Sequence, residues 1–217
     1  MSDEAAVYEP AKRYFAEIMM PFRAIIRKNL EKIKDLPIEI IAPSHGPLYK
    51  RPEFIIDAYK EWTSDTAKNE VVIPYVSMHG STAILVNRLA AALVEKGIIV
   101  HPFNLAMTDV GKLAMSLVDA ATIVVGCPAV HVGPHPAALY AVALANALRP
   151  KARFASVVGS YGWGNKIVET IKGLIPNLKV ELLTPVIAKG LPREVDLKAI
   201  DALAAAIAEK HKTLGLS

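Results

Sequence analysis

The hydrophobic pattern changes near residue 70. From there on, short apolar, β-branched runs alternate with longer segments in which apolar residues recur at helical spacing. Runs of the first kind predict strands and segments of the second kind predict amphipathic helices. Five of each in alternation indicate a doubly wound parallel sheet. We expect strands at residues 71–76, 98–103, 121–127, 153–158 and 179–183, and helices at 82–96, 110–117, 136–148, 165–174 and 197–212.

Residues 1–69 do not follow this alternation, so we predict an appendage there and a sheet domain over residues 70–217. In residues 10–35 we expect two helical pieces divided near Pro21, then a strand at 38–41 and a helix at 52–62. These elements are too few for a core of their own. We therefore expect the appendage to pack on something outside the chain; the alternatives are packing on the sheet domain or dimerisation. Its predicted apolar face comprises Phe15, Ile18, Met19, Phe22, Ile25, Ile26, Leu30 and Ile33.

Composition narrows the class of protein. The chain has 217 residues, of which 53% are apolar, and this is enough for a sizeable core. Its one cysteine, Cys127, excludes an internal disulfide and fits a reducing cytoplasm. The net charge of +4 is scattered, so nucleic acid is not an expected partner. Because no apolar run reaches membrane-spanning length and the N-terminus has no signal-peptide pattern, we expect a cytoplasmic protein without membrane association.

The loop after the first strand of the sheet domain is rich in hydroxyl groups and leads directly into a helix. Hydroxyls of Ser77, Ser81 and Thr82, with backbone N–H groups at the helix start, can surround a phosphate dianion. The loop lacks the lysine of a Walker motif and the glycines of a dinucleotide site, which favours a monophosphate such as that of FMN. The alternative is an ordinary helix cap. The predicted phosphate loop consists of Ser77, Met78, His79, Gly80, Ser81 and Thr82.

The loops after the third and fourth strands should reach the same edge of the sheet, where doubly wound folds bind ligands. Small residues in them let the backbone approach a flat ring, and Tyr161 and Trp163 offer aromatic faces for stacking. The alternative for Trp163 is plain core packing. We predict ring contacts from Pro128, Ala129, Val130, His131 and Gly133 in the third loop, and from Ser160, Tyr161, Gly162, Trp163 and Gly164 in the fourth.

Residues 71–217 resemble the flavodoxin domain of flavodiiron proteins, also called A-type flavoproteins, in SMHGST at 77–82 and more specifically in GSYGW at 159–163. Residues 12–62 resemble the end of that family's metallo-β-lactamase-like domain, in AKRYF at 11–15 and IAPSHGP at 41–47. The resemblance implies a flavodoxin-like sheet with strand order 2-1-3-4-5 and a mainly helical N-terminal appendage. It also implies FMN as cofactor, which in the family passes electrons to a diiron site that reduces O2 or NO.

The resemblance also shows departures from the family pattern. The H-x-E-x-D-H iron-ligand cluster of the family does not occur, because Met1 begins too late to include it. The histidine matching His45 is the family's last iron ligand, so we expect His45 to bind metal only if another chain completes the site; otherwise it is a turn residue. Where the family usually has Ser-Pro-Thr and an Asn, this chain has Cys127, Pro128, Ala129 and His131, which removes hydrogen-bonding groups near the flavin.

Three functions fit these observations. The favoured one is an FMN-binding electron-transfer subunit of a split flavodiiron-type oxidoreductase, whose partners are a separate metallo-β-lactamase-like chain or a second copy of itself, and an electron-donor protein. The second is a stand-alone flavodoxin-like electron carrier without metal. The third is a truncated interaction protein that does not bind FMN. The sequence predicts no catalytic acid or base, and the absence of G-x-S-x-G argues against a hydrolase.

Overall fold

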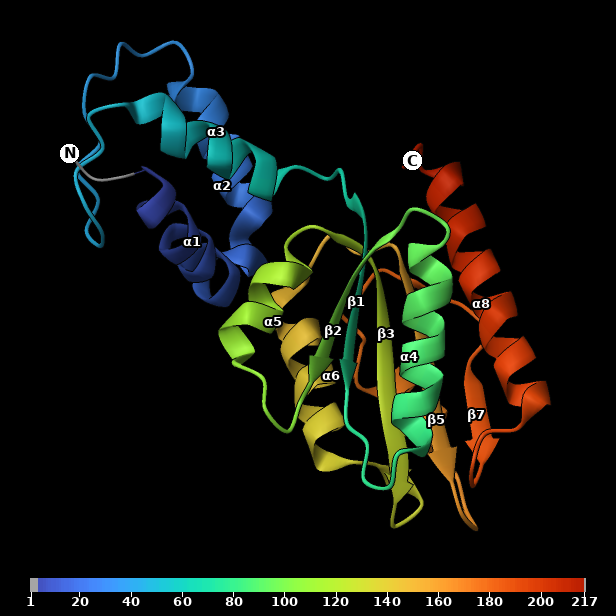
Figure 1. Cartoon of the computed structure of the whole chain (residues 1–217). Coiled ribbons are helices and arrows are strands. Elements are labelled where there is room, and N and C mark those ends of the chain that lie inside the picture. The colour runs from blue at the N-terminus through green and yellow to red at the C-terminus, as the bar shows by residue number, and fades with distance from the viewer. Residues whose placement is uncertain (1–3, 217) are drawn as a thin grey trace.

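A computed structural model describes residues 4–216. Its central sheet has the order β2-β1-β3-β5-β6, and every pairing along this path is parallel. A further strand, β7, also pairs in parallel with β5, and β4 pairs antiparallel with the end of β3. The predicted order 2-1-3-4-5 is confirmed, because β6 and β7 together occupy the fifth position (Figure 1). The strands are β1 Lys68–Tyr75, β2 Ile99–Asn104, β3 Ala120–Val130, β4 Gly133–Pro134, β5 Phe154–Tyr161, β6 Glu181–Leu182 and β7 Val186–Lys189.

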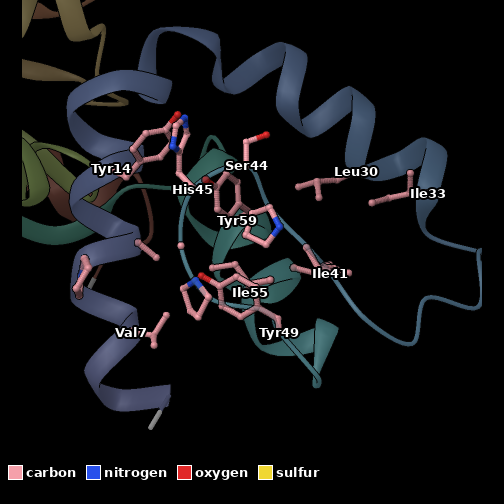
Figure 2. Close-up of a pocket in the computed structure, with 16 residues that line it drawn as sticks. Val7, Tyr14, Leu30, Ile33, Ile41, Ser44, His45, Tyr49, Ile55 and Tyr59 are labelled. Carbon is pink, nitrogen blue, oxygen red and sulfur yellow. The ribbon is translucent and has the colours of Figure 1, made fainter. Parts of the chain in front are cut away.

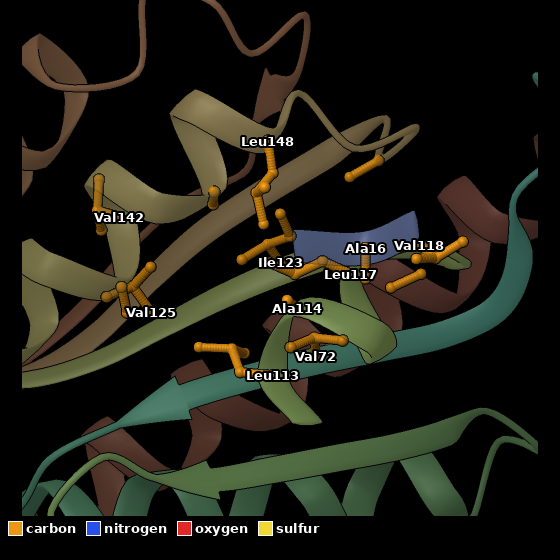
Figure 3. Packing of buried hydrophobic residues seen from close by; sticks show 14 of the residues in the cluster. Ala16, Val72, Leu113, Ala114, Leu117, Val118, Ile123, Val125, Val142 and Leu148 are labelled. Atoms are coloured by element: carbon orange, nitrogen blue, oxygen red, sulfur yellow. The ribbon is translucent and has the colours of Figure 1, made fainter. Parts of the chain in front are cut away.

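Helices cover both faces of the sheet, as the continuous apolar strands require. One face carries α5 Val110–Leu117, α6 Pro136–Leu148 and α7 Ile167–Gly173, and the other carries α4 Ser81–Val94 and α8 Glu194–Thr213 (Figure 1). Each face has its own buried core, and Figure 3 shows part of the first, between β1, β3, α5 and α6. Within residues 4–216, no helix is both long enough and apolar enough to cross a membrane.

The appendage consists of helical segments that change type near Pro21. α1 (Glu4–Tyr14) continues through a π-helical turn (Phe15–Met19) and a 3₁₀ turn (Met20–Phe22) into α2 (Arg23–Ile33). The predicted break is confirmed, since proline cannot donate to the helical ladder. The predicted helix at 52–62 is α3 (Pro52–Thr63).

The predicted strand at 38–41 is wrong. Only Ile41 forms a bridge there, with Tyr49 on the far side of the turn. In the described part of the chain, residues 38–40 have no neighbouring strand with which to form a ladder. A short β-branched run does not form a strand without such a neighbour, whatever its composition.

The expectation that the appendage packs on something outside the chain is wrong for its first half. Phe15, Ala16 and Met20 are buried and join the core beneath α5 and α6, and Ala16 lies beside Leu117 in Figure 3. Trp62, predicted to begin the linker, is also buried in this core. The predicted single apolar face therefore divides in two. Its other members include Ile18, Phe22 and Ile25, which are 53%, 52% and 61% exposed.

A charge cluster around the buried carboxylate of Asp119 joins the appendage to the sheet domain; its lysines are the buried Lys151, the partly buried Lys12 and the exposed Lys68. Lys12 of α1 donates to Asp119 Oδ2 at 2.6 Å, and Lys151 Nζ lies 3.5 Å from Asp119 Oδ1. Burial opposes ionisation of this carboxyl, but the hydrogen bond and charge of Lys12 outweigh it and lower the pKa of Asp119. Lys151 also donates to the carbonyl of Glu61 in α3. The cluster thus connects α1, α3 and the amino end of the sheet.

His211 fixes α8 to the sheet and should make stability depend on pH. It is buried between Thr122 (Nε2 to Oγ1, 2.7 Å) and Asn69 (Nδ1 to Oδ1, 2.8 Å), and burial lowers its pKa. The unfolded chain therefore binds this proton more readily, so the free energy of unfolding falls as pH drops below about 6.5, by at most ~1.4 kcal/mol per pH unit. Urea unfolding at two pH values measures the slope. His211→Gln keeps a donor and an acceptor but does not titrate, so equal slopes in both proteins would contradict the prediction.

Candidate functional site

The loops that follow β1, β3, β5 and β7 meet at the carboxyl edge of the sheet and enclose a cleft of about 430 Å³. This volume lies within the usual range of small-molecule sites. The structure thus brings together most of the residues predicted from the sequence. The cleft is lined by Ser77, Met78, His79, Ser81, Thr82, Pro128, Ala129, Val130, His131, Ser160, Tyr161, Gly162, Trp163 and Gly190.

The first loop turns sharply into α4 at Gly80. This residue has a φ of +88°, and no atom lies within 4 Å of the position that a Cβ would occupy, so the glycine serves the turn and leaves open space above the helix. Gly80 itself does not line the cleft. Ser77 Oγ accepts a hydrogen bond from the backbone N–H of Ala83 at 3.2 Å. This residue therefore does satisfy a backbone donor at the start of α4, as the helix-cap alternative expected. The 14-residue helix directs the positive end of its dipole at the cleft.

Thr82 and Ser160 form the floor of the cleft. Their side-chain oxygens lie 3.3 Å apart, and the two residues are only 1% and 7% exposed. This contact joins the first turn of α4 to the end of β5. The hydroxyl of Thr82 therefore has a partner within the protein, whereas Ser77 and Ser81 lie closer to the surface.

β3 runs three residues past its predicted end at 127, so Cys127 lies within the strand. It is fully buried, and burial raises the pKa of its thiol to about 12. The thiol is therefore protonated and serves as an apolar filler in the core. His131 is exposed beside the cleft. His135 instead caps α6, since its Nδ1 accepts from the backbone N–H of Ala137 at 3.1 Å.

Some of the residues predicted to contact the ring line the cleft and others do not. Trp163 is 94% exposed at the rim of the cleft, so the core-packing alternative for this residue is wrong. Gly133 and Gly164 do not line the cleft: Gly133 belongs to β4, and Gly164 lies against the side chain of Val132. Gly190 was missed, although a glycine that closely follows a short apolar run, here after Lys189, is a turn signal. It has a φ of +75° and donates to the carbonyl of Tyr161 at 2.8 Å.

A second cavity, of about 560 Å³, lies within the appendage (Figure 2). Apolar side chains of α1, α2 and α3 and the turn at 41–49 surround it, and burial raises the pKa of Tyr59 there. His45 lines this cavity, with its ring 5.9 Å from that of Tyr14, and it is exposed. Across residues 4–216, no group of three or more His, Cys, Asp or Glu side chains could hold a metal ion. His45 has no companion ligands in the described chain, so this chain alone does not fit a diiron centre.

No protein-family model matches the sequence, but individual proteins do. The nitric oxide reductase of Moorella thermoacetica is 32% identical over 202 residues, which are 90% of this chain and 50% of the reductase. The rubredoxin oxygen:oxidoreductase of Desulfovibrio gigas superposes with a TM-score of 0.89 at 24% identity over 95% of this chain and 53% of its own. The flavodiiron protein of Giardia intestinalis superposes with a TM-score of 0.82 at 20% identity, over 94% of this chain and 51% of that one.

This chain is a homologue of the flavodiiron proteins. The fold is flavodoxin-like, as predicted. The chain spans about half the length of the curated relatives it matches. The sequence match covers 90% of this chain and the structural match covers 95% of it, so both include the appendage as well as the sheet domain.

Proposed function

We propose that this chain binds FMN in the cleft at the carboxyl edge of the sheet and is the electron-transfer part of a flavodiiron-type oxidoreductase. The main support for the proposal is that one cleft is lined both by groups suited to a phosphate and by groups suited to an aromatic ring. A hydroxyl-rich loop at the positive end of α4 suits a phosphate, and an exposed indole, that of Trp163, suits a flat ring.

The residues present fit FMN. Ser77, Ser81 and the first N–H groups of α4 suit the phosphate, and the exposed imidazole of His79 can donate to it from the same loop. Tyr161 and Trp163 suit the ring, and their loop supplies backbone N–H groups. FMN, when bound, supplies the redox chemistry. The chain's own residues bind it, orient it and limit the access of water.

Native mass spectrometry of the purified protein tests this proposal directly. We expect an added mass of one FMN per chain, either as purified or after incubation with FMN, and the same spectrum gives the number of chains per assembly. A mass that stays unchanged with excess FMN would overturn the proposal and favour an interaction protein without flavin.

We further propose that a separate metallo-β-lactamase-like chain covers the cavity in the appendage and completes an iron site with His45, where NO or O2 is reduced. Three observations support this: the cavity is apolar, the chain matches only half the length of its relatives, and His45 lacks companion ligands in the described residues. The names of two similar proteins, nitric oxide reductase and rubredoxin oxygen:oxidoreductase, supply the candidate substrates.

Co-expression with a metallo-β-lactamase-like protein from the same organism tests the partner. We expect a complex that contains iron, and His45→Ala should lower the iron content while His101→Ala, at a pair with Glu70 on the sheet domain, should not. A protein that binds FMN but forms neither a complex nor an iron site would instead be a stand-alone electron carrier.

A further inference from the structure

The hairpin between β3 and β4 has an unusual tip. Two residues, His131 and Val132, connect the paired residues Val130 and Gly133, and their φ values are +49° and +74°. Positive φ at both central residues is the mark of a type I′ turn, which Asn and Gly favour. For a β-branched residue such as Val132, a positive φ is a genuine outlier and stores strain. Something in the surrounding structure must hold this tip in place.

Two contacts with the loop after β5 hold it. The backbone N–H of Lys166 donates to the carbonyl of Val132 at 2.8 Å. The side chain of Val132 lies directly on Gly164: a Cβ at that glycine would come within 3.0 Å of Val132 Cγ2 and 3.3 Å of Cγ1. A side chain at position 164 would fit only if Val132 moved by a few tenths of an ångström. The strained tip is therefore clamped onto the neighbouring loop.

This clamp joins the two loops that flank the cleft. The hairpin carries His131, Tyr161 ends β5, and Trp163 lies in the loop that follows; all three residues line the cleft. Thr82 and Ser160 join α4 to β5 at the same cleft. Movement of the hairpin tip would therefore change the distance between His131 and the two aromatic residues.

We propose that Val132 is a positioning residue for the cofactor. Its side chain and carbonyl hold the tip in the strained turn, and this turn fixes His131 relative to Trp163 at the cleft. The inference rests on the proposed binding of FMN. Val132 does not line the cleft, but it would influence both the affinity for FMN and the midpoint potential of the flavin.

Two substitutions separate positioning from simple stability. Val132→Asn removes the branched side chain from Gly164 but suits a positive φ, so the midpoint of thermal unfolding should stay the same or rise. FMN binding should nevertheless weaken by about tenfold, as expected for a lost coupling between contacting residues, and the flavin midpoint potential should shift. Val132→Thr keeps the branched shape and should bind FMN like the unchanged protein.

Two further readouts complete the test. In the FMN-free protein, amide hydrogen exchange at Lys166 should be faster in Val132→Asn than in Val132→Thr, because the clamp is loosened. Gly164→Ala should weaken FMN binding in the unchanged protein but much less in Val132→Asn, since the valine methyl groups are gone. An Asn variant with unchanged FMN affinity and potential would overturn the role of Val132 alone. An unchanged protein that does not bind FMN would overturn the proposed function and this inference with it.

Discussion

Replacing Ser81 with aspartate is expected to weaken FMN binding by at least about 100-fold. Ser81 is the first residue of α4 and lines the cleft where the phosphate is proposed to bind. A carboxylate about 4 Å from a phosphate repels it by ~4 kcal/mol per charge pair at the effective dielectric of a protein surface, which is more than a 100-fold loss of affinity requires. The dissociation constant follows from quenching of flavin fluorescence on titration with the protein.

The same substitution offers its own controls. Aspartate in the first turn of a helix is favourable, so the variant should fold at least as stably as the unchanged protein. Riboflavin, which lacks the phosphate, should bind both proteins equally, and Ser81→Asn, which adds a neutral side chain of the same size, should cost far less FMN affinity. Equal loss of FMN and riboflavin binding in the Asp variant would mean that the phosphate does not sit at the start of α4.

The sheet domain was predictable from the sequence because its central strands, β1, β3 and β5, are buried on both faces. Such strands appear as continuous apolar runs, and the helices between them keep a helical period, so α5 and α6 were predicted to the residue. The short strands β4 and β7 were not, since two or four residues carry no periodicity. The strand expected at 38–41 is the opposite kind of error: its residues favour a strand, but no neighbouring strand is there to pair with them.

The cleft was predictable to the extent that it depends on topology. Loops that follow parallel strands must meet at one edge, so Ser77 and Trp163 could be placed together although they lie 86 positions apart in the sequence. Backbone conformation was not predictable. The dipeptide His131-Val132 gives no signal of a type I′ turn, and only the contact with Gly164 shows why that turn forms.

The apolar face of the appendage shows a third limit. Helical spacing indicates which residues share a side of a helix, but not which neighbour covers that side. From the sequence, Phe15 and Ile18 were equally expected to be buried. In the structure Phe15 is fully buried, whereas Ile18 is 53% exposed. The π-helical turn that contains both residues shifts the register, and the charge cluster around Asp119 fixes which side faces the sheet domain.

Asp119→Asn is expected to destabilise the protein by about 3–5 kcal/mol, the usual cost of removing one partner from a buried ion pair. The Lys151 side chain is only 1% exposed, and burial lowers the pKa of its ammonium. Without the carboxylate, Lys151 would either hold an uncompensated charge in the interior or lose its proton on folding, and both cost free energy. Lys12 would lose its 2.6 Å hydrogen bond as well. For a protein of this size the midpoint of thermal unfolding should fall by roughly 6–20 °C, as circular dichroism can measure.

A matched control is available on the surface. Asp201 forms a doubly hydrogen-bonded pair with Arg88 in which both side chains are well exposed. Asp201→Asn should cost less than about 1 kcal/mol, because water screens exposed pairs. If Asp119→Asn costs no more than Asp201→Asn, the charge cluster does not stabilise the fold. A double variant with Asp119→Leu and Lys151→Met should recover much of the loss, since apolar replacements remove both buried charges together.

The position of the cluster also predicts the order of unfolding. Asp119 joins the sheet domain to α1 through Lys12 and, through Lys151, to the end of α3, so its loss should loosen the appendage first. The chain has two tryptophans: Trp62 of α3, buried in the core that the appendage shares with the sheet domain, and the exposed Trp163. In a Trp163→Phe background, tryptophan fluorescence therefore reports the surroundings of Trp62, whose ring packs on Tyr8, Phe15 and Tyr59 of the appendage. In Asp119→Asn the fluorescence change should precede the loss of circular dichroism, whereas coincident transitions would mean that appendage and sheet unfold as one unit.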